Sequence, residues 1–252
     1  VETLEGTPIG QFEFELINQN WNISFYLTPI ANKYNLFPKM LKIVLRKFNT
    51  DPIKKIQINL NESSYISTFQ NLLHLESNFI NLNDKKLKIG ICLSKSSWFY
   101  DSVLDFAVDC LMKGHLISIV NSHNDLPSVD IALFLSYEKR VSSDFFKKNR
   151  YNLVVHSSDL PLGKGWSPLT WQILEGKNTI INTLFEIDEN LDSGPIIDKN
   201  FFELNGTELL DQIRVKQAKS ILELCNKFIN NHQQLYASKK IQKGSESYFK
   251  RN

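Results

Sequence analysis

Short apolar runs alternate with helix-like segments from residue 87 onward, and this alternation restricts the fold more than any other feature of the chain. Strand-like runs lie at residues 87–93, 116–120 and 129–135, with helical periodicity at 101–112 after the first run and at 143–148 before the strand that precedes His156. Strands that alternate with helices are typical of a parallel sheet covered by helices. We therefore expect an α/β fold with a Rossmann-like, doubly wound and mostly parallel sheet, whose functional site lies at the carboxyl ends of strands.

The N-terminal part of the sequence has a different pattern. Alternating apolar residues at 11–17 and 21–27 predict a β-hairpin. A helix at residues 38–48, a strand at 56–60 and a helix at 65–75 would complete a small α+β unit. This unit carries no motif, and three roles stay open for it: substrate binding, dimerisation of the protein into a homodimer, and a remnant of a longer chain.

We place the boundary between two domains in the polar stretch 81–86. Residues 1–85 then form the small α+β unit, and residues 86–252 form the α/β domain. Apolar side chains at helical spacing predict a packing helix over residues 207–229. The basic and polar residues 239–252 are expected to fray.

Composition excludes several functional classes. The net charge of +2 is the small difference between 29 basic and 27 acidic residues, so we expect no nucleic-acid partner. No apolar run approaches the roughly 18 residues that cross a bilayer, and the first residues lack a secretion signal. The three cysteines are widely spaced in apolar surroundings, which favours reduced core thiols in the cytoplasm over disulfides or a zinc site. We expect a cytoplasmic protein with no membrane partner and no metal.

Two polar loops follow apolar strands in the second half of the chain. The strand Leu153–Val155 ends at His156, which opens a loop of Ser, Asp, Pro and Gly residues. The alternating run 180–187 leads into a second loop that contains Asp192. If the two loops face each other across a cleft, His156 and Asp192 form one proton-transfer pair.

These loops resemble the signature of the formyltransferase family that uses N10-formyltetrahydrofolate. The family core reads Asn-x-His-x-Ser-(x)2-Pro-(x)3-Gly, and an Asp-(Ser/Thr/Ala)-Gly loop follows about 36 residues after the histidine. This sequence matches with His156, Ser158, Pro161 and Gly165, and Asp192 lies 36 residues after His156, followed by Ser-Gly. The resemblance covers roughly residues 86–205.

The resemblance implies an enzyme that moves a formyl group from N10-formyltetrahydrofolate to an amine. His156 would stabilise the oxyanion of the tetrahedral intermediate, and Asp192 would charge or orient the imidazole and help remove the amine proton. The folate co-substrate would lie against Leu135, Ser136, Tyr137, Asp188 and Glu189.

The loop Gly-Lys-Gly-Trp-Ser-Pro indicates the substrate that accepts the formyl group. It is similar to the corresponding loop of enzymes that formylate the amino group of nucleotide-linked deoxy sugars. We therefore expect the amine of a nucleotide-linked amino deoxy sugar, a precursor in surface polysaccharide biosynthesis. The residues expected to bind it are Ser94, Lys95, Ser158, Lys164 and Trp166. Ser94 and Lys95 follow the first strand of the α/β domain, where many folds bind phosphate.

Two departures from the family pattern keep alternatives open. Val154 stands where the family has its catalytic asparagine, and Phe185 replaces a histidine often seen seven places before the aspartate. Asn152 lies two residues before Val154 on the same strand face and is a candidate to replace the missing amide, through an irregularity of the strand. The alternative functions are formylation of another amine, in a purine precursor or an aminoacyl-tRNA, and binding of folate or nucleotide sugar without catalysis. Relatives that act on initiator tRNA carry a further C-terminal domain for which we expect no room here.

Overall fold

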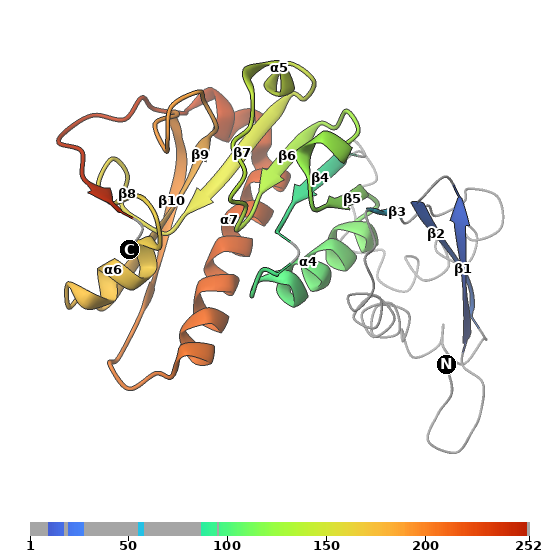
Figure 1. Cartoon of the computed structure of the whole chain (residues 1–252), viewed down its shortest axis with the longest axis horizontal. Helices are drawn as coiled ribbons and strands as arrows, with labels where there is room; N and C mark the ends of the chain where they lie inside the picture. The colour runs from blue at the N-terminus through green and yellow to red at the C-terminus, as the bar shows by residue number, and fades with distance from the viewer. Residues whose placement is uncertain (1–9, 18–19, 28–54, 58–86, 95, 251–252) are drawn as a thin grey trace. The chain divides into compact units, whose positions relative to one another are not determined.

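The computed structural model describes residues 10–17, 20–27, 55–57, 87–94 and 96–250, which Figure 1 draws in colour. The chain divides into two compact units. The first combines Val1–Ile91 with Tyr100–Pro127, and the second combines Cys92–Phe99 with Ser128–Asn252. The domain boundary predicted at 81–86 lies outside the described residues, as do the helices predicted at 38–48 and 65–75.

The first unit contains the predicted hairpin. Strands β1 (Gly10–Ile17) and β2 (Asn20–Leu27) pair antiparallel in regular register. Strand β3 (Lys55–Gln57) pairs parallel with β2 and antiparallel with β5 (Leu116–Val120). The strand expected at 56–60 therefore begins one residue earlier than predicted.

The β-α-β segment that the sequence predicts for the start of the α/β domain belongs largely to the first unit. Strand β4 (Lys88–Cys92) is followed by α4 (Tyr100–Met112), which packs against β5. All residues of β4 after Lys88 are buried, which is typical of a strand covered on both faces. A short 3-10 helix, η1 (His123–Asp125), follows β5.

The second unit has the strand order β6-β7-β9-β10. Strand β6 (Ile131–Phe134) runs parallel to β7 (Tyr151–His156), and the short helix α5 (Ser143–Phe146) lies in the connection between them. Strand β9 (Thr179–Glu186) pairs antiparallel with β7, and β10 (Ile196–Glu203) pairs antiparallel with β9. The expected α/β, Rossmann-like fold with a mostly parallel sheet is confirmed, with an antiparallel edge of two strands.

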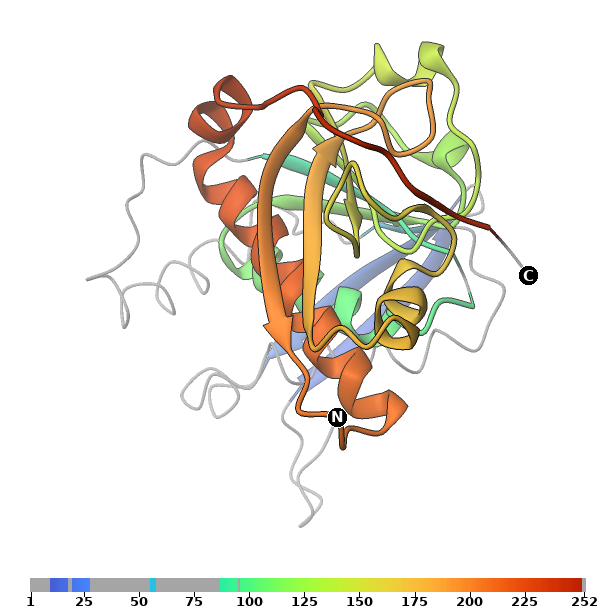
Figure 2. The ribbon, with the colours of Figure 1, turned by 90° about the vertical axis from the view of Figure 1, so that its left-hand side faces the viewer.

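Helix α7 (Leu210–Ala237) packs against β10 and β9, and Figure 2 shows it running alongside these strands. Apolar residues from Ala218 to Ile229 line its buried face. A polar contact also holds the helix, because the Asn182 Nδ2 of β9 donates to Ser220 Oγ at 2.8 Å. The packing helix predicted over 207–229 is thus present and longer than expected. No helix in the described ranges combines the length and the apolar composition that a bilayer crossing requires.

The described part of the segment after α7, residues 239–250, is held by regular contacts, so the prediction that it frays was wrong; residues 251–252 lie outside the described residues. Strand β11 (Tyr248–Phe249) pairs parallel with β8 (Lys164–Gly165), which directly precedes α6 (Pro168–Leu174). Figure 2 shows the segment in dark red, running from the end of α7 toward the C-terminus. Its backbone hydrogen bonds join Lys240 to Ile196 and residues 247 and 249 to the loop at 161–166, partners distant in sequence that a local reading of composition does not include.

All three cysteines are expected to resist alkylation in the native protein. Cys92, Cys110 and Cys225 are fully buried, and burial raises the pKa of the Cys92 and Cys110 thiols to about 12. Because the thiolate is the nucleophile, both thiols stay protonated and unreactive at pH 8. Mass spectrometry after iodoacetamide treatment should show no adduct without denaturant and three adducts in urea. Rapid labelling of the folded protein would contradict the buried placement.

Candidate active site

His156 ends strand β7, and its side chain points into the turn that follows. The Nε2 atom lies 2.9 Å from the carbonyl oxygen of Gly163. Because a carbonyl oxygen only accepts, Nε2 carries the proton when this bond forms. The imidazole therefore presents an N–H to residues 163–165, which we name the glycine loop. This N–H faces the second polar loop, which contains Asp192.

Asp192 reaches this imidazole from the loop between β9 and β10. Its Oδ2 atom lies 3.8 Å from His156 Nε2, and the two side chains are only 13% and 11% exposed. The same Oδ2 accepts a hydrogen bond from the backbone N–H of Gly165 at 2.8 Å. Asp192 itself adopts a left-handed conformation with φ of 50°. The two residues that the sequence motif singles out therefore meet, with the carboxylate held by the glycine loop.

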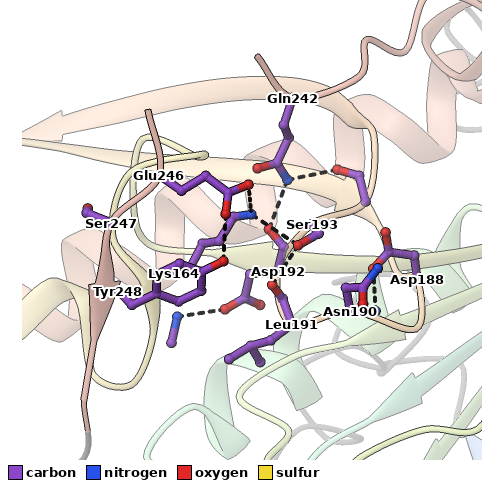
Figure 3. A network of polar contacts seen from close by, with 12 residues as sticks. Lys164, Asp188, Asn190, Leu191, Asp192, Ser193, Gln242, Glu246, Ser247 and Tyr248 are labelled. Carbon is purple, nitrogen blue, oxygen red and sulfur yellow. Dashed lines mark hydrogen bonds and ion pairs between the residues drawn. The ribbon is translucent and has the colours of Figure 1, made fainter. Parts of the chain in front are cut away.

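Lys164 is fully buried between the two loops. Its Nζ donates to Ser193 Oγ at 3.0 Å and to Glu246 Oε1 at 2.7 Å, as Figure 3 shows. The same ammonium lies 5.7 Å from the ring centroid of Tyr248. A buried ammonium requires such compensation, because an isolated buried charge is strongly destabilising. Lys164 thus joins the glycine loop, the residue after Asp192 and the C-terminal segment.

Gly194 fixes the exit of the Asp192 loop. A Cβ built on Gly194 would lie 1.6 Å from the carbonyl oxygen of Glu186, so no other residue fits without displacing the loop. On the Glu186 side chain, Oε1 accepts a hydrogen bond from Tyr236 at 2.5 Å and Oε2 pairs with Lys239. The glycine of the Asp-Ser-Gly sequence is therefore required by a close backbone approach.

Gly194→Ala is expected to destabilise the protein strongly. Relief of the clash with Glu186 requires a backbone shift, and overpacking of this kind costs about 3 kcal/mol. Gly176→Ala is the control, because nothing lies within 4 Å of its added Cβ and only its φ of 79° is unfavourable. That conformation costs roughly 1 to 2 kcal/mol. Urea unfolding measures both, and a smaller loss for Gly194→Ala than for Gly176→Ala would contradict the close approach.

Asn152 lies far from this cluster. Strand β7 is regular from Asn152 to His156, which places Asn152 about 13 Å along the strand at about 3.3 Å per residue. The Asn152 Nδ2 donates to the carbonyl of Phe146, and its Oδ1 accepts from Asn149, both at 3.0 Å. Val154 lies between them, opposite Phe185 of β9. The structure does not bring Asn152 to His156.

The residues expected to bind the acceptor differ in their placement. The Ser158 side chain is buried, and its Oγ has no hydrogen-bond partner among the described residues. Trp166 is half-buried, and its backbone N–H donates to the carbonyl of Phe249 at 3.1 Å. Ser94 closes a turn by accepting from the N–H of Ser97, whereas Lys95 lies outside the described residues.

The residues expected at the folate lie in two turns. Leu135 is buried and can offer only its backbone, Ser136 has a left-handed φ of 48°, and Tyr137 contacts the ring of Phe134. Asp188 begins the other turn and accepts from the N–H of Asn190 at 3.0 Å. Burial raises the pKa of the Asp188 carboxyl, a shift partly offset by the Asn190 hydrogen bond and by Lys164. Glu189 is exposed in the same turn.

Three site residues were missed by the sequence analysis. Gln242 donates to the carbonyls of Asp192 and Gly194, both at 2.9 Å. Glu246 pairs with Lys164, and Ser247 Oγ accepts from the N–H of Gly163 at 2.8 Å. Their only signal in the sequence is the β-favouring pair Tyr-Phe at the end of a polar stretch, which is too short to predict a strand.

Comparisons with known proteins support the resemblance noted in the sequence, because curated relatives are formyltransferases and solved formyltransferase structures share the Rossmann-like fold. The methionyl-tRNA formyltransferase of Rickettsia rickettsii is 30% identical over 147 residues, 56% of this chain and 47% of that protein. The methionyl-tRNA formyltransferase from Clostridium thermocellum matches with a TM-score of 0.55 at 22% identity, over 66% of this chain and 73% of that chain.

A second solved structure, HypX from Aquifex aeolicus in complex with tetrahydrofolic acid, matches with a TM-score of 0.56 at 16% identity. It covers 66% of this chain and 30% of that chain. No protein-family profile matches the sequence. The chain spans about half or less of the length of the curated relatives that it matches.

Proposed function

We propose that this chain transfers a formyl group from N10-formyltetrahydrofolate to a primary amine. The observation that carries the proposal is the distance of 3.8 Å between His156 Nε2 and Asp192 Oδ2. The pair lies beside the glycine loop, in a fold shared with a solved formyltransferase. An imidazole N–H and a carboxylate are the two groups that amine formylation needs, one for the oxyanion and one for the proton.

The folate co-substrate supplies an activated formyl carbon when it is bound. The turns at Leu135–Tyr137 and Asp188–Glu189 fit it chemically, because a pterin edge needs hydrogen-bonding groups of both kinds. The first turn offers backbone groups around the left-handed Ser136, and the second offers two carboxylates. The structural relative HypX was solved with tetrahydrofolic acid, which supports the same class of co-substrate here.

His156 has the role of oxyanion donor in this proposal. Its Nε2–H now bonds the Gly163 carbonyl and can instead donate to a formyl oxygen that enters the loop. Asp192 would accept the proton that the attacking amine loses, and this proton would pass to the folate nitrogen as its bond to the formyl carbon breaks. The Asp192 charge also stabilises a protonated imidazole. Both side chains are largely shielded from water, which strengthens their mutual attraction.

The amide that the family uses beside the histidine has no counterpart in our proposal. Asn152 holds the loop after α5 with both ends of its side chain, and β7 has no irregularity that would bring it closer. We propose that His156 and backbone N–H groups suffice for catalysis. Ser158, two residues after His156, is a further candidate donor, because its buried Oγ has no hydrogen-bond partner among the residues that the structure describes.

Two acceptors are candidates, and the relatives favour the first. The matched curated proteins are methionyl-tRNA formyltransferases, which favours the amine of an aminoacyl-tRNA. The expectation that no nucleic acid is bound is therefore open again. The loop Gly163–Pro168 favours the second candidate, a nucleotide-linked amino sugar, with Trp166 and Ser94 as contacts. Lys164 is too deeply buried to meet either acceptor without a rearrangement.

The experiment that tests the function uses both acceptors in parallel. The protein is incubated with N10-formyltetrahydrofolate and either methionyl-tRNA or a panel of amino dideoxy sugar nucleotides. Mass spectrometry should show a gain equal to one CO on one acceptor class, which identifies the substrate. Folate binding without gain on any amine would contradict catalysis and support the binding-protein alternative.

A further inference from the structure

The segment of residues 239–249, which we name the C-terminal strap, is anchored along its length to both candidate catalytic loops. Lys239 pairs with Glu186, and Lys240 exchanges two backbone hydrogen bonds with Ile196. Further along, β11 pairs with β8. The strap therefore spans the exit of the Asp192 loop and the glycine loop, as Figures 2 and 3 show.

Asp192 is held by the strap directly at one point and through Gly165 at a second. Its backbone carbonyl accepts from Gln242, so the strap fixes the peptide on which the carboxylate is mounted. Its carboxylate accepts from the N–H of Gly165, which is itself paired with Phe249 of the strap. A Cβ on Gly165 would lie 2.4 Å from the Phe249 carbonyl oxygen, so the two backbones are in close contact.

The charge of Lys164 is balanced by the strap. Glu246 is the residue that forms an ion pair with it, at 2.7 Å, and Ser193 adds a neutral contact. Tyr248 in turn donates to the second oxygen of Glu246 at 2.6 Å. The hydrogen bond from Lys164, together with that from Tyr248, holds the pKa of the Glu246 carboxyl below its usual range.

Removal of the Glu246 charge would leave a buried ammonium in need of another anion. The positive charge of Lys164 already acts on Asp188, where it offsets part of the rise in pKa that burial causes, so the acidic loop that holds Asp188 and Asp192 is the alternative source of an anion. Asp192 is next to Ser193, which Lys164 already contacts. A shift of the unbalanced Lys164 would act on the loop through Ser193, and so move the adjacent Asp192 carboxylate from its place beside Gly165 and His156.

We propose that Glu246 is a positioning residue of the catalytic pair: by balancing Lys164 it keeps the Asp192 carboxylate beside His156. The strap is then part of the active site, although it contributes no group to the reacting atoms. The kinetic side of this inference rests on the proposed function, whereas the placement of Asp192 can be measured without it.

The test compares Glu246→Gln with Glu246→Asp and with the control Glu223→Gln. The control removes a carboxylate from an exposed i,i+4 pair on α7 and should leave activity unchanged. Glu246→Gln should lower kcat for formyl transfer by about 10²-fold, as a displacement of about 1 Å at reacting groups does. KM for formyl-folate should change little, and Glu246→Asp should recover part of kcat. An unchanged kcat in Glu246→Gln would overturn the proposal.

A second measurement is independent of activity. Hydrogen exchange at the Gly165 amide, followed by NMR, should accelerate in Glu246→Gln because its bond to Asp192 opens. If the wild-type protein transfers no formyl group, the proposed function is wrong. The positioning role is judged separately, and unchanged protection of the Gly165 amide in Glu246→Gln would overturn it. Should Glu246→Gln fail to fold, Gln242→Leu keeps the Lys164 pair and removes the hydrogen bonds from the strap to the carbonyls of Asp192 and Gly194. Gln242→Leu is expected to lower kcat and Gly165 protection, and wild-type values of both would overturn the inference.

Discussion

His156→Ala is expected to lower kcat for formyl transfer by about 10²- to 10³-fold, the loss that follows removal of one preorganised oxyanion donor. The substitution removes the N–H that now bonds the Gly163 carbonyl and leaves the backbone of β7 intact. KM for the acceptor should change little, because the lost interaction is made in the transition state. Steady-state kinetics with the acceptor identified by mass spectrometry measure both constants.

Two further variants sharpen this result. His156→Gln keeps a side-chain N–H donor and is expected to recover part of the lost kcat, which a purely structural role would not predict. His123→Ala, in the 3-10 helix of the first unit, is the matched control and should retain wild-type kcat. Equal kcat for wild type and His156→Ala would remove His156 from the mechanism.

Asp192→Asn is expected to lower kcat by about 10²- to 10⁴-fold, the contribution of a positioned general base. The asparagine Oδ1 can still accept from the Gly165 N–H, so the loop should keep its conformation while it loses the negative charge. Unfolding in urea should therefore differ little from wild type. Asp211→Asn, at an exposed position in the first turn of α7, is the control. A variant that loses stability and activity in proportion would assign Asp192 a structural role.

The strands and helices from residue 87 onward could be predicted because their apolar periods are long and regular. The strands β4, β5 and β7 and helices α4 and α7 occur where the pattern indicates them. Strand β3 was placed one residue late, because element boundaries depend on partners that a local pattern does not contain. The pairing of β9 and β10 as an antiparallel edge also depends on tertiary contacts.

The meeting of His156 and Asp192 followed from motif spacing, but their support did not. Glu246 contacts Lys164 across 82 positions of sequence, and this contact exists only because β11 pairs with β8. Asn152 was predicted at the site but lies away from it. It shares a strand face with His156 in the sequence pattern, yet the rise of the strand separates them, and its amide holds a different loop.

The most direct test of formyl transfer by this site follows an isotopically labelled formyl carbon during a single turnover, with enzyme in excess over N10-formyltetrahydrofolate. With wild type and the correct acceptor, the label should leave the folate and appear as an N-formyl group on the acceptor amine. With His156→Ala, the label should stay on the folate over the same period. Release of the label as formate, or its transfer at equal rates by both proteins, would contradict catalysis by the pair of His156 and Asp192.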